Sequence, residues 1–155
     1  MTVHVVFVCL GNICRSPMAE AVMKRKVKEA GLDGQITVDS VGTGSWHVGE
    51  APCDGTIRVL RANGLGDFRH KARQLSKADF RDADYLIALD SSNLRDIRRM
   101  GDTEAEVKRL LDYAPDASTK DVPDPYYHGG FEGVYELVDA GTDGLLAHIR
   151  ETESV

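Results

Sequence analysis

A run of β-branched and aromatic residues near the N-terminus places the strongest constraint on the fold. The segment Val3–Val8 is almost continuously apolar. A short run of this kind predicts a strand buried on both faces, which is typical of parallel sheets. Ser16 and Pro17 follow after a turn, and they are favoured at a helix N-cap and at the first helical position. The sequence therefore predicts a buried strand that leads directly into a helix.

Apolar runs and helical spacing continue this alternation along the chain. Further strands are predicted at Ile36–Val41, Tyr85–Leu89 and Val107–Leu111. Helices are predicted from Ser16 to Ala30 and at Asp54–Asn63, Ser76–Phe80, Leu94–Met100 and Phe131–Ile149, with loops at 42–53 and 112–130. Two glycines, Gly141 and Gly144, weaken the last helix by about 1 kcal/mol each relative to Ala.

Strands that alternate with helices predict β-α-β units with right-handed crossovers. We therefore expect one three-layer α/β domain over residues 1–155, in which helices flank a central four-stranded parallel sheet. Ligands bind such folds at the carboxyl ends of the strands. This rule points to the residues that follow Val8, Val41 and Leu89.

Charge and cysteine content exclude several classes of protein. The formal net charge of -6 should repel nucleic acid and anionic membranes, so we predict no nucleic-acid partner. No apolar stretch approaches the roughly 18 residues of a spanning helix, and no basic and apolar leader opens the chain. Three cysteines are an odd number and a poor disulfide framework. We expect a monomer in a reducing cytoplasm, without membrane insertion.

The segment between the first strand and the first helix has the features of an anion-binding loop. It runs into a helix N-terminus, where unpaired N–H groups face outward. Gly11 and Asn12 tolerate left-handed backbone angles, which lets successive N–H groups curl around one centre. Arg15 offers a planar fork of donors to two phosphate oxygens. The predicted phosphate-binding loop consists of Leu10, Gly11, Asn12, Ile13, Cys14, Arg15 and Ser16.

Cys9 opens this loop. The loop N–H dipoles and Arg15 favour its thiolate, which makes Cys9 a candidate nucleophile. The alternative is that Cys9 is only a small apolar residue at the end of a buried strand. A zinc site is disfavoured because no second Cys or His pair lies near Cys9 and Cys14, so we predict no metal. A nucleotide-binding loop fails because G-x-x-x-x-G-K-[ST] is missing.

The segment C-L-G-N-I-C-R-S at residues 9–16 strongly resembles the signature of the low-molecular-weight protein tyrosine phosphatases. The resemblance extends over the chain through Gly44–Gly49, His70–Gln74, Ala88–Asp90 and Asp124–Tyr127. It implies a Rossmann-like fold of the phosphotyrosine phosphatase I type. It also implies cofactor-free hydrolysis of protein phosphotyrosine and small aryl phosphates through a phosphocysteine intermediate.

The resemblance also assigns roles to particular residues. Cys9 would be the nucleophile, Arg15 the stabiliser of transition-state charge, and Asp124 the general acid and then the general base. The supporting residues are Asn12, Ser40 and His70, which brace the loop, Ser16, which hydrogen-bonds the sulfur, and Asp90, which orients Arg15. The substrate cleft would be walled by Ile13, Trp46, Tyr126 and Tyr127. An apolar slot as deep as a phenyl ring would favour phosphotyrosine over phosphoserine.

The residues alone leave several of these assignments open. Asp121 lies three residues before Asp124, Asp-Pro pairs are ordinary turn formers, and the choice of Asp124 rests on D-P-Y-Y. The aromatic residues Trp46, Tyr126 and Tyr127 also fit ordinary core or surface positions. Cys14 is either a buried small residue or a redox partner that forms a reversible disulfide with Cys9. Cys53 is interpreted as structural, and His4, His47, His128 and His148 receive no role.

Tyrosine-phosphorylated proteins are the implied partners. A cognate tyrosine kinase is a further candidate, because Tyr126 and Tyr127 match positions that are phosphorylated in some family members. One rival function is a thioredoxin-coupled arsenate reductase, but this chemistry needs two more cysteines near the end of the third strand. That region reads Asp90-Ser91-Ser92-Asn93, and no Cys follows Cys53. The other rival is a phosphotyrosine-binding module without turnover, which should lack the nucleophile, the Arg or the acid.

Overall fold

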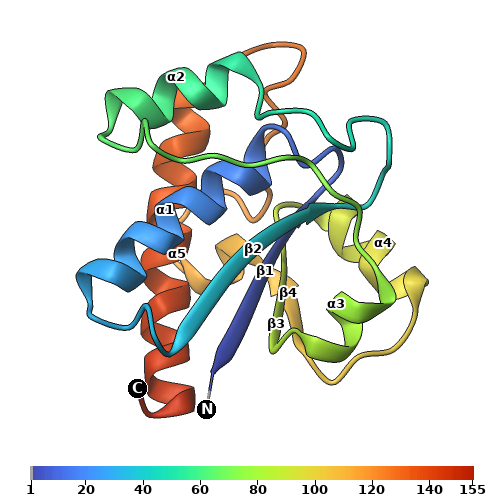
Figure 1. Cartoon of the computed structure of the whole chain (residues 1–155), viewed down its shortest axis with the longest axis vertical. Helices are drawn as coiled ribbons and strands as arrows, with labels where there is room; N and C mark the ends of the chain where they lie inside the picture. Colours follow the sequence, from blue (N-terminus) through green and yellow to red (C-terminus); the bar gives the residue numbers. More distant parts are fainter. Residues whose placement is uncertain (1) are drawn as a thin grey trace.

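A four-stranded parallel sheet forms the centre of the computed structural model, which describes residues 2–155. The strand order is β2-β1-β3-β4 (Figure 1). The strands are β1 (Val3–Cys9), β2 (Ile36–Gly42), β3 (Tyr85–Ala88) and β4 (Glu106–Arg109). All three neighbouring pairs are parallel, and β1 pairs with β2 from Val3↔Ile36 to Cys9↔Gly42. The predicted α/β fold with a central four-stranded parallel sheet is therefore confirmed.

Helices cover both faces of this sheet. The long helices α1 (Arg15–Glu29) and α5 (Phe131–Glu153) pack against each other on one side, where α2 (Asp54–Ala62) contacts both of them. The other side carries α4 (Ser91–Met100), which contacts β3 and β4, and the short helix α3 (Lys77–Asp82) (Figure 1). None of the helices within residues 2–155 combines the length and the apolar character that a membrane crossing requires.

The continuous apolar run of β1 supplies both halves of the core. Val5 and Phe7 lie in one buried cluster with residues of α1 and α5, whereas Val6 and Val8 lie in a second cluster with Ile97 of α4. Alternate residues of a strand point to opposite faces of the sheet, so a strand covered by helices on both sides needs apolar residues throughout. This confirms the reading of Val3–Val8 as a strand buried on both faces.

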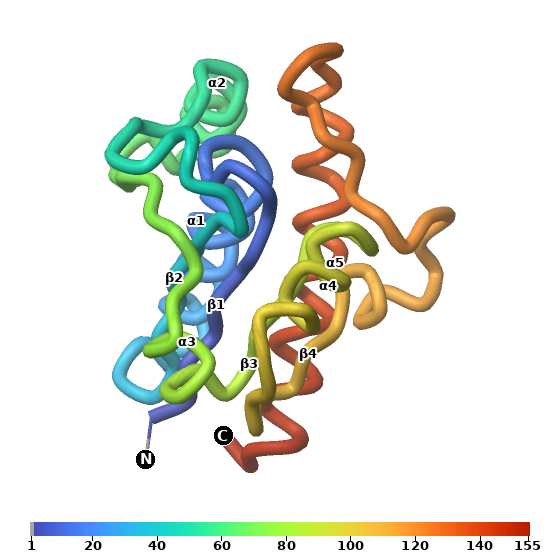
Figure 2. The backbone as a smooth tube through the Cα atoms, turned by 90° about the vertical axis from the view of Figure 1, so that its right-hand side faces the viewer, coloured from blue at the N-terminus to red at the C-terminus, as the bar shows by residue number. Residues whose placement is uncertain are grey.

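The parallel topology places the carboxyl ends of all four strands at one edge of the sheet. Both chain termini lie at the end opposite to the turn that leaves β1 (Figures 1 and 2). The strand order reverses at β1, because the chain adds β2 on one side of β1 and then β3 on the other. Ligands bind open α/β sheets in the crevice at such a switch point. Cys9 ends β1, and Asp90 directly precedes α4 at the same edge.

Several predicted boundaries were wrong, including the following three. Helix α1 begins at Arg15 with Cys14 at its N-cap, so Ser16 lies in the first turn and its side chain does not cap the helix. Helix α4 begins at Ser91 and not at Leu94, because the Asp90 side chain accepts a hydrogen bond from Asn93 N and caps it. The strand predicted at Val107–Leu111 ends at Arg109, and Leu110–Tyr113 forms a 3₁₀ turn instead.

The glycines of α5 have a packing role. A Cβ atom on Gly144 would lie 1.8 Å from the carbonyl oxygen of Tyr113, and one on Gly141 would lie 2.5 Å from Cγ of Leu110. The two glycines therefore let α5 approach the 3₁₀ turn more closely than any other residue allows. The helix is continuous from Phe131 to Glu153 despite the low helix propensity of glycine.

Candidate active site

The Cys9–Ser16 loop joins β1 to α1 and is almost entirely buried. Its turn depends on Asn12, which has a φ of 57°. Among residues 2–155, only Asn12 and Ser154 combine a side chain with a positive φ, so the left-handed position predicted for Gly11 and Asn12 is held by Asn12 alone. Gly11 instead makes room for a neighbour, since a Cβ atom there would lie 3.0 Å from Cδ2 of His47.

The sulfur of Cys9 is the focus of this loop. Cys9 is 3% exposed, and its Sγ atom lies 2.9 Å from the Ser16 hydroxyl and 3.3 Å from the Asn12 backbone nitrogen. The Asn12 amide donates to the same Ser16 oxygen, at 2.9 Å. The Ser16 hydroxyl can donate either to the sulfur or to the Val41 carbonyl oxygen, which lies 3.4 Å away. The Asn12 N–H and the Ser16 hydroxyl are therefore the two donors within reach of the Cys9 sulfur.

Arg15 is held behind the loop by carboxylates and a carbonyl. Its Nη1 atom lies 2.6 Å from Asp90 and 3.0 Å from the carbonyl oxygen of Val122, and its Nη2 atom lies 3.6 Å from Asp124. Burial lowers the pKa of Arg15, but the negative charges of Cys9, Asp90 and Asp124 raise it above its ordinary value. Arg15 is only 3% exposed and remains a cation. Asp90 is well placed to orient it.

The Asn12 side chain connects the loop to β2 and to the segment after α2. Its amide nitrogen donates to the hydroxyls of Ser16 and Ser40, and its oxygen accepts from the His70 ring at 2.8 Å and from the Arg73 backbone nitrogen at 2.9 Å. The four sites of this amide are thereby satisfied. The structure thus brings together Asn12, Ser16, Ser40 and His70, as the sequence predicted.

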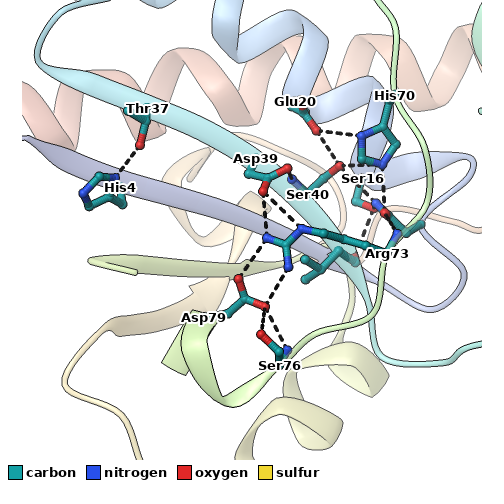
Figure 3. A network of polar contacts seen from close by, with 12 residues as sticks. His4, Ser16, Glu20, Thr37, Asp39, Ser40, His70, Arg73, Ser76 and Asp79 are labelled. Atoms are coloured by element: carbon teal, nitrogen blue, oxygen red, sulfur yellow. Dashed lines mark hydrogen bonds and ion pairs between the residues drawn. The ribbon is translucent and has the colours of Figure 1, made fainter. Parts of the chain in front are cut away.

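Two members of this network were missed from sequence. Glu20 of α1 is 2% exposed, and its carboxylate accepts from Ser40 at 2.7 Å and lies 3.4 Å from Nδ1 of His70 (Figure 3). Arg73 lies between Asp39 of β2 and Asp79 of α3 and pairs with both (Figure 3). An acidic residue in a helix and a basic residue in a loop look solvated in the sequence, so no local signal identifies them.

Glu20, Asp39 and His70 also approach one another closely enough to hold a metal ion, with one ligand atom of each within 4.8 Å of the others. Arg73 already provides a positive charge there, 2.7 Å from Asp39. Burial lowers the pKa of His70, although the charges of Glu20 and Asp39 act against this. Glu20 also pairs with Lys24 at 2.6 Å, so each carboxylate of this cluster has a cationic partner.

A cleft of about 370 Å³ opens above the Cys9 sulfur. Its floor contains Cys9, Ile13 and Arg15, which are buried. Its edge, here called the cleft rim, is formed by Trp46, Asp124, Tyr126 and Tyr127. All four predicted cleft residues therefore line the cavity. His47, which received no role from sequence, lines it too, with its ring centroid 5.7 Å from that of Tyr126.

The structure separates the two candidate carboxylates. Asp124 lines the cleft, is within 3.6 Å of Arg15, and accepts a hydrogen bond from Tyr126 N at 3.1 Å. Asp121 does not line the cleft and instead accepts from the backbone and hydroxyl of Ser91 at the start of α4, at 2.9 and 2.7 Å. Of the two, only Asp124 faces the place where a substrate would bind.

The second loop cysteine contacts the third cysteine of the chain. Cys14 packs against Cys53, which follows the 42–53 loop at the N-terminus of α2. The interaction with the Cys53 thiol, together with burial and nearby negative charge, raises the pKa of Cys14, whereas the interaction with Cys14 lowers the pKa of Cys53 to about 6. All three cysteines are free. Cys53 N also donates to the Ile13 carbonyl oxygen at 2.7 Å, in keeping with a structural role.

Comparisons with known proteins agree with this geometry. The sequence model of the family described as low molecular weight phosphotyrosine protein phosphatase matches residues 4–155. The chain is 46% identical to the low molecular weight protein-tyrosine-phosphatase YfkJ of Bacillus subtilis over 99% of both chains. It is 48% identical to a low molecular weight protein-tyrosine-phosphatase of Streptomyces coelicolor, over 97% of this chain and 96% of the relative.

Solved structures give the same result. The crystal structure of YfkJ from Bacillus subtilis superimposes with a TM-score of 0.92 at 45% identity, over 98% of this chain and 97% of that one. A structure described as DARP, Drosophila arginine phosphatase, has a TM-score of 0.88 at 34% identity, over 94% of this chain and 97% of that one. The chain thus belongs to the low molecular weight protein tyrosine phosphatases, a family of hydrolases whose substrates are phosphotyrosine-containing proteins.

Proposed function

We propose that the chain hydrolyses protein phosphotyrosine through a phosphocysteine intermediate, with Cys9, Arg15 and Asp124 as its catalytic residues. The observation that carries this proposal is their convergence on one cleft. A phosphate seated above the sulfur meets the N–H groups of the Cys9–Ser16 loop and the guanidinium of Arg15. These fixed donors stabilise the charge on the equatorial oxygens, which is the main contribution of a protein to phosphoryl transfer.

In the first step the Cys9 thiolate attacks phosphorus. The sulfur–phosphorus bond forms while the bond from phosphorus to the tyrosine oxygen breaks. Asp124 donates its proton to that oxygen, so that neutral phenol leaves. The partial exposure of Asp124, 42% for its side chain, suits a group that must exchange protons with water between turnovers.

In the second step water replaces the sulfur. Asp124, now a carboxylate, accepts a proton from water as the water oxygen bonds to phosphorus. The sulfur–phosphorus bond breaks and releases inorganic phosphate. The Ser16 hydroxyl, 2.9 Å from the sulfur, donates a hydrogen bond to the departing thiolate. No metal or cofactor takes part in either step.

The cleft walls support an aromatic substrate. Ile13, Trp46, Tyr126 and Tyr127 present apolar surface around the buried sulfur. The ring of phosphotyrosine is long enough to span the distance from the rim to the floor. The side chain of phosphoserine is shorter, so its phosphate would not reach the Cys9–Ser16 loop. One structural relative is described as an arginine phosphatase. A guanidinium needs acceptors for its N–H groups, and in this cleft Asp124 is the carboxylate that could accept from them, whereas the apolar walls contact a phenyl ring along its length.

We also propose that Cys14 protects Cys9 from irreversible oxidation. A peroxide converts the Cys9 thiolate to a sulfenic acid and is itself reduced to water or an alcohol. The Cys14 sulfur then attacks the Cys9 sulfur, a disulfide forms, and hydroxide leaves as water. Thiols reverse the reaction. Cys14→Ser should therefore recover far less activity than wild type after peroxide followed by dithiothreitol, with Cys53→Ser as the matched control; equal recovery in all three proteins excludes this role for Cys14.

The cellular setting follows from the same proposal. Phosphotyrosine proteins and the kinase that produces them share a reducing cytoplasm, where three free thiols persist. We propose that the chain acts there as a monomer, with a tyrosine kinase that modifies Tyr126 or Tyr127 as a further partner. Tyr127 is 83% exposed and thus accessible to a kinase.

The test is hydrolysis without metal. In the presence of EDTA, we expect turnover of p-nitrophenyl phosphate and of a phosphotyrosine peptide, and little turnover of the matching phosphoserine peptide. A rapid quench should trap phosphate on Cys9. Binding of the phosphotyrosine peptide without turnover would identify a binding module instead. Thiol-dependent reduction of arsenate would favour the reductase, which lacks relay cysteines at the end of β3 in this sequence.

A further inference from the structure

Exposed apolar side chains gather around the cleft. Within residues 2–155, six large apolar side chains are exposed: Leu10, Trp46, Val48, Met100, Tyr126 and Tyr127. Single exposed apolar residues are normal on protein surfaces, but a group of them marks a contact surface. Three of the six belong to the cleft rim. Leu10 and Met100 lie outside the cleft rim, and both line a second groove.

The second groove lies between the Cys9–Ser16 loop and helix α4 and has a volume of about 310 Å³. From α4 it is lined by Asp96, Arg99 and Met100, whose spacing of three and four residues places them on one face of the helix. Leu10 and Trp46 line the opposite side. We call this cavity the α4 groove. Its apolar surface comes mainly from Leu10, Trp46 and Met100.

The α4 groove adjoins the catalytic cleft. Leu10 and Trp46 line both cavities, so the indole of Trp46 stands between them. The indole packs directly on the backbone of Gly44, because a Cβ atom there would lie 1.9 Å from the ring. Trp46 is 71% exposed and yet supported from behind, as a fixed wall between two binding sites should be.

We propose that the α4 groove binds an apolar side chain of the substrate protein that flanks the phosphotyrosine. The proposal rests on the proposed function, because the phosphotyrosine ring must occupy the cleft on the other side of Trp46. An extended peptide advances by about 3.3–3.6 Å per residue, so a residue close to the phosphotyrosine reaches the neighbouring groove. Leu, Met or Phe at that position loses apolar surface to water on contact with Leu10 and Met100.

The charges at the edge of the groove suit the same occupant. Arg99 is 75% exposed and lies 3.7 Å from Asp96, a weak surface pair in which the guanidinium keeps donors free. The groove therefore tolerates an acidic residue of the peptide beside the apolar one. Over the rest of the surface, the net charge of -6 of the chain disfavours acidic residues. The groove thus accepts an apolar residue even where its neighbour in the peptide is acidic.

The experiment compares peptides that differ only in their flanking residues. Leu replaces Gly at one position at a time on either side of phosphotyrosine, and kcat/KM is measured for each peptide and for p-nitrophenyl phosphate. We expect one position at which Leu raises kcat/KM about 3- to 10-fold, as partial burial of a Leu side chain provides. Met100→Ala should reduce this preference and Met100→Glu should abolish it, both without a change for p-nitrophenyl phosphate.

Val48→Ala is the matched control. Val48 is exposed in the same loop as Trp46 but lines neither cavity, so this variant should retain the Leu preference. The proposal is wrong if Met100→Glu keeps the Leu preference. It is also wrong if the wild type self-associates with increasing concentration and Met100→Glu does not, because the groove would then bind a second copy of the chain. If the wild type hydrolyses phosphotyrosine peptides normally but shows no Leu preference, only the role of the α4 groove is wrong. If the wild type turns over no phosphotyrosine peptide at all, the proposed function is wrong.

Discussion

The floor and the rim of the cleft are built in opposite ways. Cys9 and Arg15 on the floor, and Asn12, which holds their loop in place, are each no more than 3% exposed, and their polar atoms have partners from three other segments of the chain. On the rim, Tyr127 is 83% exposed, and Asp124 is held by a hydrogen bond to the nearby Tyr126 nitrogen and a 3.6 Å ion pair with Arg15.

The difference fits two demands of the proposed reaction. Charge that develops on phosphorus oxygens must meet donors that are already in place, because donors that reorient during the reaction reduce the gain. A proton donor must instead exchange protons with water, and the rim must admit a protein substrate. We therefore expect floor substitutions to remove catalysis whatever the substrate, and rim substitutions to have effects that depend on the leaving group or the peptide.

The largest effect is expected from Cys9→Ser. A hydroxyl is a much weaker nucleophile than a thiolate at neutral pH, so turnover of every aryl phosphate should fall by at least about 10,000-fold. The surrounding donors remain, so the variant should still bind phosphate or vanadate. Phosphate release for turnover and isothermal calorimetry for binding provide the two measurements.

Cys53→Ser makes the same chemical change outside the cleft and should keep most of the activity. A Cys9→Ser protein that turns over aryl phosphates would show that another residue attacks phosphorus. Loss of vanadate binding together with turnover would show a collapsed loop, and circular dichroism would then separate misfolding from chemistry.

The next largest effect is expected from Asp124→Ala, the one rim substitution that should rival a floor substitution. General acids contribute about 100- to 10,000-fold, and that contribution grows as the leaving group becomes more basic. A phenol of high pKa should therefore be affected most and p-nitrophenol least. Steady-state rates for a series of aryl phosphates measure this dependence directly.

Asp121→Ala is the control for that series. Asp121 holds Ser91 at the start of α4 and does not face the cleft, so the variant should affect all leaving groups alike and weakly. If Asp124→Ala loses the same share of its rate for every leaving group, Asp124 is not the general acid. If the loss in Asp121→Ala grows with the basicity of the leaving group, Asp121 is the general acid instead.

The same contrast explains how much could be predicted from sequence. The floor is largely one contiguous segment, so the strand, the turn and Arg15 follow from local patterns of burial, spacing and helix start. Asp124 lies 109 residues beyond Arg15, and only the tertiary fold brings them within 3.6 Å. Residues alone therefore left Asp121 and Asp124 open, and the choice of Asp124 rested on the family resemblance.

The errors near the cleft floor come from polar contacts between side chains that local sequence patterns do not reveal. Ser16 was expected to cap α1, yet its hydroxyl contacts Cys9 and Asn12, and Cys14 occupies the cap position without a capping side chain. A local preference gives way where a side chain has buried polar partners elsewhere in the loop. Glu20 and Arg73 were missed because they act through Ser40 and Asn12, which are distant in sequence. Charged residues of this kind resemble solvated ones until the fold is known.

The smallest of the expected effects on turnover comes from Asn12, which tests whether the floor is rigid because of its side-chain network. Asn12→Ala leaves Ser16, Ser40, His70 and the Arg73 nitrogen without their common partner and forces Ala to adopt a φ of 57°. We expect the free energy of unfolding to fall by about 2–4 kcal/mol and kcat to fall about 10- to 100-fold, with KM for aryl phosphates changing little. Denaturant unfolding and steady-state kinetics measure the two.

Asn12→Gly separates the network from the backbone. Glycine also removes the amide but adopts the left-handed conformation without strain, so it should lose about 1 kcal/mol less stability than Ala while losing the same share of kcat. Recovery of full kcat in Asn12→Gly would mean that the turn alone positions Cys9 and that the bonds to Ser16 and Ser40 are dispensable. Equal defects in stability and in kcat for Gly and Ala would instead show that backbone strain at this position costs nothing, and that the amide alone couples the buried floor to β2.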